Sequence, residues 1–248
     1  MPQYRLGKDY ARTLNDVVGS SDFKSPEAVL RHLVQTHASG LIQRNQTAII
    51  DPQAADNGAR RTQEQWISYF NNAGKAMISA PNMYQAGKTA SDEVLASLKS
   101  DFDASWLVTS TRISYSGDDL SGRVIHNYGS IVVKPSQRDV KVIPVYDSMP
   151  LAQALRSDKG IAYIHFLFDT SDEPKDIAGT LENLSKRGAE RIALWTPNHG
   201  SRGSYNERAV GFYVDGGRFH VFGILHLVDF GRSRGVLMKS PRSGRAKK

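Results

Sequence analysis

Residues 161–196 read IAYIHFLFDTSDEPKDIAGTLENLSKRGAERIALWT, and they predict the centre of the fold. The apolar run at 161–168 and the shorter run at 191–196 have the composition of buried strands. Between them, the segment from Pro174 to Lys186 has a helical pattern, and Gly188 follows it. Two strands joined through one helix form a βαβ unit, so we expect these strands to be parallel.

The segments upstream of this unit change from helical to alternating periodicity near residue 100. Helices are predicted over 25–40 and 62–72, from Ser91 onward, and over 148–157. Alternating apolar residues predict strands over 106–115, 123–134 and 140–146. The last two strands are joined by a polar turn at 135–138, which predicts an antiparallel hairpin.

Downstream of the unit, a second hairpin closes the fold. Its strands are predicted over 208–214 and 218–227, and Asp215-Gly216-Gly217 forms the turn between them. This turn places His220 opposite Tyr213. The sequence therefore predicts an α+β fold, in which a helical N-terminal part packs on a mixed β-sheet with one βαβ crossover and two antiparallel hairpins.

The net charge of +7 is concentrated in one segment. Residues 231–248 contain seven basic side chains and no acidic one, whereas residues 1–230 contain 25 of each sign. The seven are Arg232, Arg234, Lys239, Arg242, Arg245, Lys247 and Lys248. We therefore predict a single domain over 1–230, helical over about 1–100 and sheet-forming over about 101–230, followed by a basic tail over 231–248.

Several classes of protein are excluded by composition. The chain has no cysteine, which excludes disulfide scaffolds, thiolate zinc sites and cysteine nucleophiles. No apolar run approaches the roughly 20 residues that a membrane helix needs, and the first residues have no hydrophobic signal core. We therefore expect a soluble, cytoplasmic protein without a membrane span.

One predicted site lies at the carboxyl ends of the two parallel strands, where open α/β sheets bind their ligands. Asp169 follows the first strand, and His199 and Arg202 follow the second. His199 beside Asp169 would transfer a proton, and Arg202 would bind a phosphate. The loop offers three further anion ligands, which are Ser201, Asn206 and Arg208. The alternative is a solvated connection in which Asp169 caps a turn.

Three other patterns have both a functional and a structural interpretation. Gly87-Lys88-Thr89 resembles the end of a phosphate-binding loop, but Asn82 stands where that motif requires glycine, which favours an ordinary turn. Asp139-Val140-Lys141 matches a nuclease pattern, but hairpin register favours an ion pair between Lys134 and Asp139. The same register places His126 on a polar face opposite Asp147, either as a base or as a solvated contact.

The function that these patterns favour is association with nucleic acid or another polyanion. The basic tail would contact the phosphate backbone without sequence specificity, and the loop over 198–208 would make a more defined anion contact. A hydrolase acting on a phosphorylated substrate through Asp169, His199 and Arg202 is the alternative, and a structural or assembly protein is a third. The patterns indicate no metal ion and no particular cofactor, and they leave open whether the protein is an enzyme.

Overall fold

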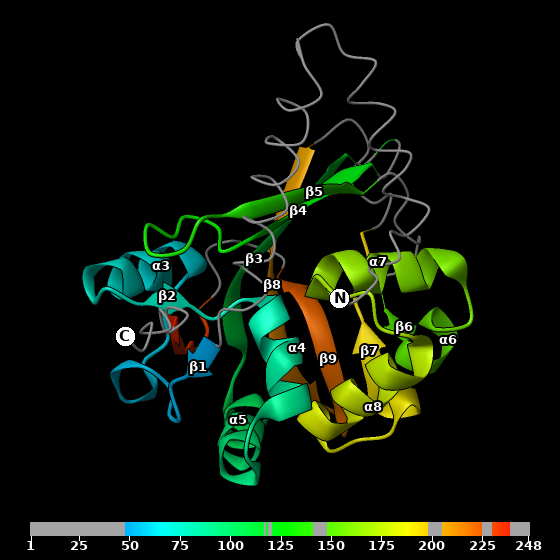
Figure 1. The fold of residues 1–248 in the computed structure, drawn as a ribbon, viewed down its shortest axis with the longest axis horizontal. Coiled ribbons are helices and arrows are strands. Elements are labelled where there is room, and N and C mark those ends of the chain that lie inside the picture. Colours follow the sequence, from blue (N-terminus) through cyan, green and yellow to red (C-terminus); the bar gives the residue numbers. More distant parts are fainter. Residues whose placement is uncertain are drawn as a thin grey trace, which may run out of the picture. The chain divides into compact units, whose positions relative to one another are not determined.

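A computed structural model describes residues 48–116, 118, 121–140, 148–197, 205–224 and 230–238 (Figure 1). All of them lie in the compact unit Ala48–Met238. The helix predicted over 25–40 and the strand predicted over 140–146, apart from Val140, lie outside the described residues. No helix in the described ranges is long and apolar enough to cross a membrane.

The fold is α+β, as predicted, and is built on a mixed seven-stranded sheet with the order β5-β4-β3-β8-β9-β7-β6. The pair β7 and β9 is parallel, and the other neighbours are antiparallel. The strands are β3 (Leu107–Ser116), β4 (Gly122–His126), β5 (Ser136–Val140), β6 (Met149–Pro150), β7 (Ile192–Leu194), β8 (Tyr205–Asp215) and β9 (Arg218–Ile224).

A second sheet of three short strands has the order β1-β10-β2. These strands are β1 (Ala48–Ile50), β2 (Ala76–Met77) and β10 (Gly235–Met238). Strand β10 lies between the other two, and Ile49 pairs with Leu237. The segment predicted as the start of a basic tail is therefore the central strand of a sheet as far as Met238.

The helices begin at local signals that are visible in the sequence. Thr62 and Ser91 cap α3 and α5 as expected, and Thr62 forms a reciprocal capping box with Gln65. Ser79 caps a further helix, α4, which the sequence pattern did not predict. The helices are α3 (Gln63–Asn72), α4 (Ala80–Thr89), α5 (Asp92–Ala104), α6 (Leu151–Ala154), α7 (Asp158–Phe168) and α8 (Pro174–Ser185), with short 3-10 turns at Asp56–Gly58 and Ala189–Arg191.

The predicted βαβ crossover is wrong, because its first strand is the helix α7. The hydroxyl of Ser157 accepts a hydrogen bond from the Gly160 amide and so starts the helix. The buried side chains of α7 recur one helical turn apart, at Tyr163, Ile164, Leu167 and Phe168. An eight-residue apolar run fits a buried strand and a buried helix equally well, and here the N-cap decides for the helix.

The closing hairpin is confirmed with its register. Strands β8 and β9 pair antiparallel, and Tyr213 lies opposite His220. Gly216 and Gly217 have φ angles of 53° and 76°, a left-handed conformation that glycine adopts without steric cost. Strand β7 then adds parallel to β9, so the parallel pair exists but joins different strands from those predicted.

The first hairpin forms with a different register. Strand β4 ends at His126, because Asn127 and Gly129 adopt φ angles of 53° and 67°. The side chain of Asn71 in α3 holds the following loop by donating to the Gly129 carbonyl and accepting from the Ile131 amide. The connection therefore spans 127–135 rather than the predicted four-residue turn, and every pairing shifts.

The sheet and the helices enclose two apolar cores. The larger core contains side chains of α4, α5, α7 and α8 together with Phe212 and Phe219 of the sheet. Figure 1 shows α4 and α8 in front of the sheet, and α4 packs against both α7 and α8. The smaller core contains Trp66 and Phe70 of α3 with Val108 and Ala209 of the sheet. Helix α3 is therefore held firmly against the sheet.

Candidate functional site

The first predicted catalytic residue, Asp169, lies at the end of a helix rather than a strand. It is the C-cap of α7, with a φ angle of 46°. Its carboxylate forms an ion pair with Arg138 of β5, with 2.6 Å between Nη2 and Oδ1. Its proposed partners His199 and Arg202 lie outside the described residues, as does Ser201. The catalytic role of Asp169, His199 and Arg202 therefore remains a prediction. The argument that placed these residues together at the ends of two parallel strands no longer holds, because the first of those strands is a helix.

The two predicted anion ligands at the end of the same loop lie on β8. Asn206 pairs with Tyr115 of β3, and Arg208 pairs with Ile113. Both side chains are half-buried. They are therefore part of the sheet, and their role as anion ligands remains a prediction.

Arg232 and Arg234 are the two basic residues of the predicted tail that the structure describes, and both form ion pairs with Asp101. Arg234 is fully buried, and its Nε donates to Asp101 Oδ2 at 2.8 Å. Its other donors reach the Ser97 hydroxyl and the Asp51 carbonyl. Arg232 Nη1 lies 3.3 Å from the other oxygen of Asp101. A buried guanidinium cannot contact a polyanion, so Arg234 serves the fold. The remaining basic residues, Lys239, Arg242, Arg245, Lys247 and Lys248, lie outside the described residues.

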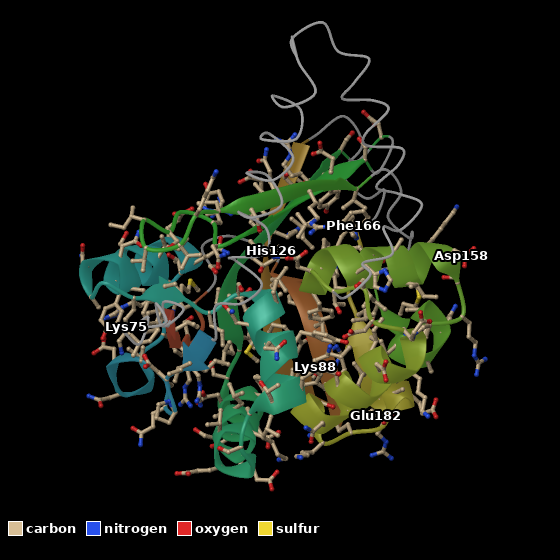
Figure 2. All side chains as sticks on the ribbon, in the orientation of Figure 1. Lys75, Lys88, His126, Asp158, Phe166 and Glu182 are labelled. Atoms are coloured by element: carbon tan, nitrogen blue, oxygen red, sulfur yellow. The ribbon has the colours of Figure 1, made fainter. Side chains whose placement is uncertain are left out.

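His126 is buried rather than on a polar face, and it lies opposite Ser136 instead of Asp147. Its Nε2 lies 3.1 Å from the Phe166 carbonyl of α7 (Figure 2), so this nitrogen carries a proton and donates it. Its Nδ1 lies 3.1 Å from the Thr111 hydroxyl and accepts from it. Burial lowers the pKa of His126 to about 4, despite the charge of Asp169. His126 is therefore a neutral core residue at pH 7.

The two remaining motifs also have structural roles. Asp139 forms the expected cross-strand ion pair, but with Arg123 instead of Lys134, with 2.7 Å between Nε and Oδ1. No cluster of His, Asp and Glu that would hold a metal ion occurs among the described residues. Gly87 lies inside α4, where an added Cβ would come within 2.6 Å of the Thr180 carbonyl of α8. It therefore permits close helix packing rather than phosphate binding.

An open groove of about 620 Å³, which the sequence patterns did not predict, lies at the start of α3. Its lining residues are Arg60, Arg61, Glu64, Gln65, Ser68 and Phe230. Phe230 is 53% exposed, which is unusual for a large aromatic side chain. Arg60 is exposed, and its Nη2 donates to the Phe230 carbonyl at 3.2 Å. Two guanidinium groups and an accessible aromatic ring therefore share one concave surface.

The second arginine of the groove is held in a fixed position. The Arg61 guanidinium carbon lies 5.0 Å from the centre of the Trp66 ring and 5.2 Å from that of Tyr69. Arg61 also forms an ion pair with Asp56, where the chain turns before α3. These contacts orient the guanidinium before any ligand binds, which reduces the entropic cost of binding.

A buried arginine supports the groove from the sheet. Arg112 of β3 pairs with Glu64, which lines the groove, and with Glu207 of β8 at 3.2 Å. Its Nε donates to Gln63 Oε1 at 3.0 Å, and its guanidinium lies 3.5 Å above the centre of the Tyr128 ring. Arg112 therefore anchors the first turn of α3 to the sheet.

The groove left a weak signal in the sequence. Arg60 and Arg61 are adjacent basic residues directly before the N-cap Thr62, so the sequence indicates a positively charged start of this helix. The sequence does not indicate that Phe230 lies beside these arginines, because Phe230 is 170 positions away from Arg60. Comparison with protein-family models, with curated proteins and with solved structures finds no match for this chain.

Proposed function

We propose that this protein binds single-stranded nucleic acid through its phosphate backbone. The observation that carries the proposal is the separation of charge between the compact unit and the flanking sequence. Ala48–Met238 contains 21 basic and 21 acidic side chains and is electrically balanced. Residues 239–248 contain five basic side chains and no acidic one. Such a segment releases counterions when it neutralises phosphates, and this is the sequence-independent part of nucleic-acid affinity.

The groove at the start of α3 favours a single strand over a duplex. Proteins that bind single strands combine cationic side chains with exposed aromatic rings, on which unpaired bases stack. Arg60 and Arg61 supply the charge and Phe230 supplies the ring. In a duplex the faces of the bases are already stacked on one another, so Phe230 would gain nothing from it.

Salt dependence of affinity tests the proposal. The full chain and a variant ending at Met238 are titrated with a fluorescein-labelled oligothymidylate at several NaCl concentrations, and Kd is read from anisotropy. Met238 is the last residue of β10, so this truncation leaves the sheet intact. If all five cations contact phosphates, the log–log slope of the association constant is about 3.5 units shallower in the truncated chain. Equal affinities and equal slopes for the two chains would refute the proposal.

A second experiment separates the groove from the basic segment. If both guanidinium groups contact phosphates, the double variant Arg60→Gln/Arg61→Gln makes the slope shallower by about 1.4 units with a single strand, and by about 0.7 units if Arg61 stays paired with Asp56. Phe230→Ala should weaken binding of the single strand by about tenfold and leave the affinity for a duplex unchanged. The matched control is Arg156→Gln/Lys159→Gln, which removes two exposed cations near α7. If the control has the same effect as the groove variant, the groove is not the binding surface.

A further inference from the structure

A second hollow, of about 430 Å³, lies between the end of α5 and the end of β8. It is separate from the groove, because the two share no lining residue. Its walls include Phe102, Asp103, Ser105, Trp106, Tyr213 and Asp215. None of its lining residues is basic. Aromatic rings and carboxylates therefore meet in one concave site.

Two aromatic rings form a corner of the hollow. The ring centres of Trp106 and Tyr213 lie 5.9 Å apart, with their planes inclined by 49°. Tyr213 also stacks on His220 at 4.6 Å and contacts the edge of Phe222 at 5.5 Å. Trp106 and Tyr213 are half-buried, so neighbouring side chains fix the rings while part of each ring stays accessible. A fixed corner of two rings suits a compact cation, which is attracted by the negative ring faces.

The electrostatics of the hollow also favour a positive ligand. Helix α5 ends at Ala104, and its last turn contains no basic residue to offset the partial negative charge of its carbonyl groups. Asp103 is paired with Lys99 and with Arg187. Asp215 is exposed and stands opposite Arg218 across the hairpin turn, although it forms no ion pair with any residue of the described ranges. Burial, and to a smaller extent the charge of Asp215, raises the pKa of Tyr213.

We infer that this hollow binds an organic ammonium cation, held against the rings of Trp106 and Tyr213 and paired with the carboxylate of Asp215. The ligand class includes quaternary ammonium compounds and the ammonium group of a lysine side chain, because both present a compact positive charge. The inference is independent of the proposed nucleic-acid binding, since the two sites prefer charges of opposite sign.

Choline and its uncharged analogue 3,3-dimethylbutan-1-ol test the inference on the full chain. The two molecules have almost the same shape, so a difference in affinity reports the charge. Binding is followed by NMR through the indole N–H signal of Trp106, which is assigned by comparison with Trp106→Phe. Choline should bind about tenfold more tightly than the alcohol. Equal affinities, or no shift of this signal with choline, would overturn the inference.

A conservative variant tests the role of the carboxylate. Asp215→Asn should weaken choline binding several-fold and leave binding of the alcohol unchanged, since only the charge is removed. Asp139→Asn is the matched control, because Asp139 is an exposed carboxylate on β5 outside the hollow. The same two variants are titrated with Nα-acetyl-lysine amide. Preference for lysine assigns the site to a peptide side chain, and preference for choline assigns it to a free quaternary ammonium compound. An Asp215→Asn variant that binds both cations like Asp139→Asn would refute the pairing.

Discussion

Arg234, which directly precedes β10, and Asp101 of α5 form an ion pair inside the protein, although they are 133 positions apart in the sequence. The side chain of Arg234 is fully buried and that of Asp101 is 8% exposed. Ser97 and the Asp51 carbonyl accept the remaining donors of the guanidinium, so the buried charge is well solvated by protein groups. The pair attaches the central strand of the small sheet to the helical layer.

Breaking this ion pair should destabilise the protein strongly. Arg234→Met leaves the Asp101 carboxylate without its main partner, and losing one member of a buried pair costs about 3–5 kcal/mol. Urea denaturation followed by circular dichroism measures the free energy of unfolding. Arg123→Met is the matched control, because Arg123 and Asp139 are largely exposed, and such a pair contributes about 0–1 kcal/mol. Equal losses in the two variants would contradict the structural role of Arg234.

Arg112 should be irreplaceable by lysine. Its guanidinium contacts Gln63, Glu64 and Glu207 and lies over Tyr128, and a single ammonium group cannot reproduce this planar set of contacts. Arg112→Lys should lower the free energy of unfolding by about 3 kcal/mol, because buried acceptors lose their donors. The same denaturation experiment measures the loss. A change below about 0.5 kcal/mol would show that Arg112 does not anchor α3.

Gly87 and Gly179 should respond in opposite directions to the same substitution. In α4, a Cβ at Gly87 would lie 2.6 Å from the Thr180 carbonyl, so Gly87→Ala should destabilise by about 1–3 kcal/mol. In α8, a Cβ at Gly179 would meet nothing within 4 Å, so Gly179→Ala should stabilise by about 0.5–1 kcal/mol. Thermal unfolding of both variants checks the signs. Stabilisation by Gly87→Ala would mean that α4 and α8 do not pack this closely.

Helices and turns that depend on a few neighbouring residues could be predicted from the sequence. The N-caps Thr62 and Ser91 and the Gly216-Gly217 turn act within a few residues, and each predicted element formed where expected. The segment 161–168 failed because its residues are almost uniformly apolar, and periodicity cannot then distinguish a strand from a helix.

The pairing of Arg232 and Arg234 and the groove at the start of α3 both depend on contacts between distant segments, which the sequence does not reveal. Arg232 and Arg234 belong to a basic stretch by composition, and only the folded chain brings Asp101 beside them. The groove likewise combines Arg60 and Arg61 with Phe230 from a distant segment. The net charge of zero for Ala48–Met238 nevertheless follows from the sequence once the boundary of the compact unit is known.

The buried imidazole of His126 should make the protein sensitive to acid. Burial lowers its pKa from 6.5 to about 4, so between these pH values the unfolded chain binds a proton that the folded chain does not. Stability is therefore highest above pH 6.5 and falls as the pH decreases toward 4. A shift of this size corresponds to a loss of about 3 kcal/mol. Urea denaturation at several pH values between 7.5 and 4 measures it.

Two variants separate this effect from the titration of other groups. His126→Gln cannot be protonated, so its free energy of unfolding should fall by about 3 kcal/mol less than that of the wild type over the same pH range. Thr111→Val removes the hydroxyl that donates to Nδ1 but keeps the imidazole buried. It should lower stability at pH 7.5 and retain the acid-dependent loss, because desolvation is the largest cause of the lowered pKa. If His126→Gln follows the wild-type pH profile, the imidazole is not the group responsible, and its burial between Thr111 and the Phe166 carbonyl would have to be abandoned.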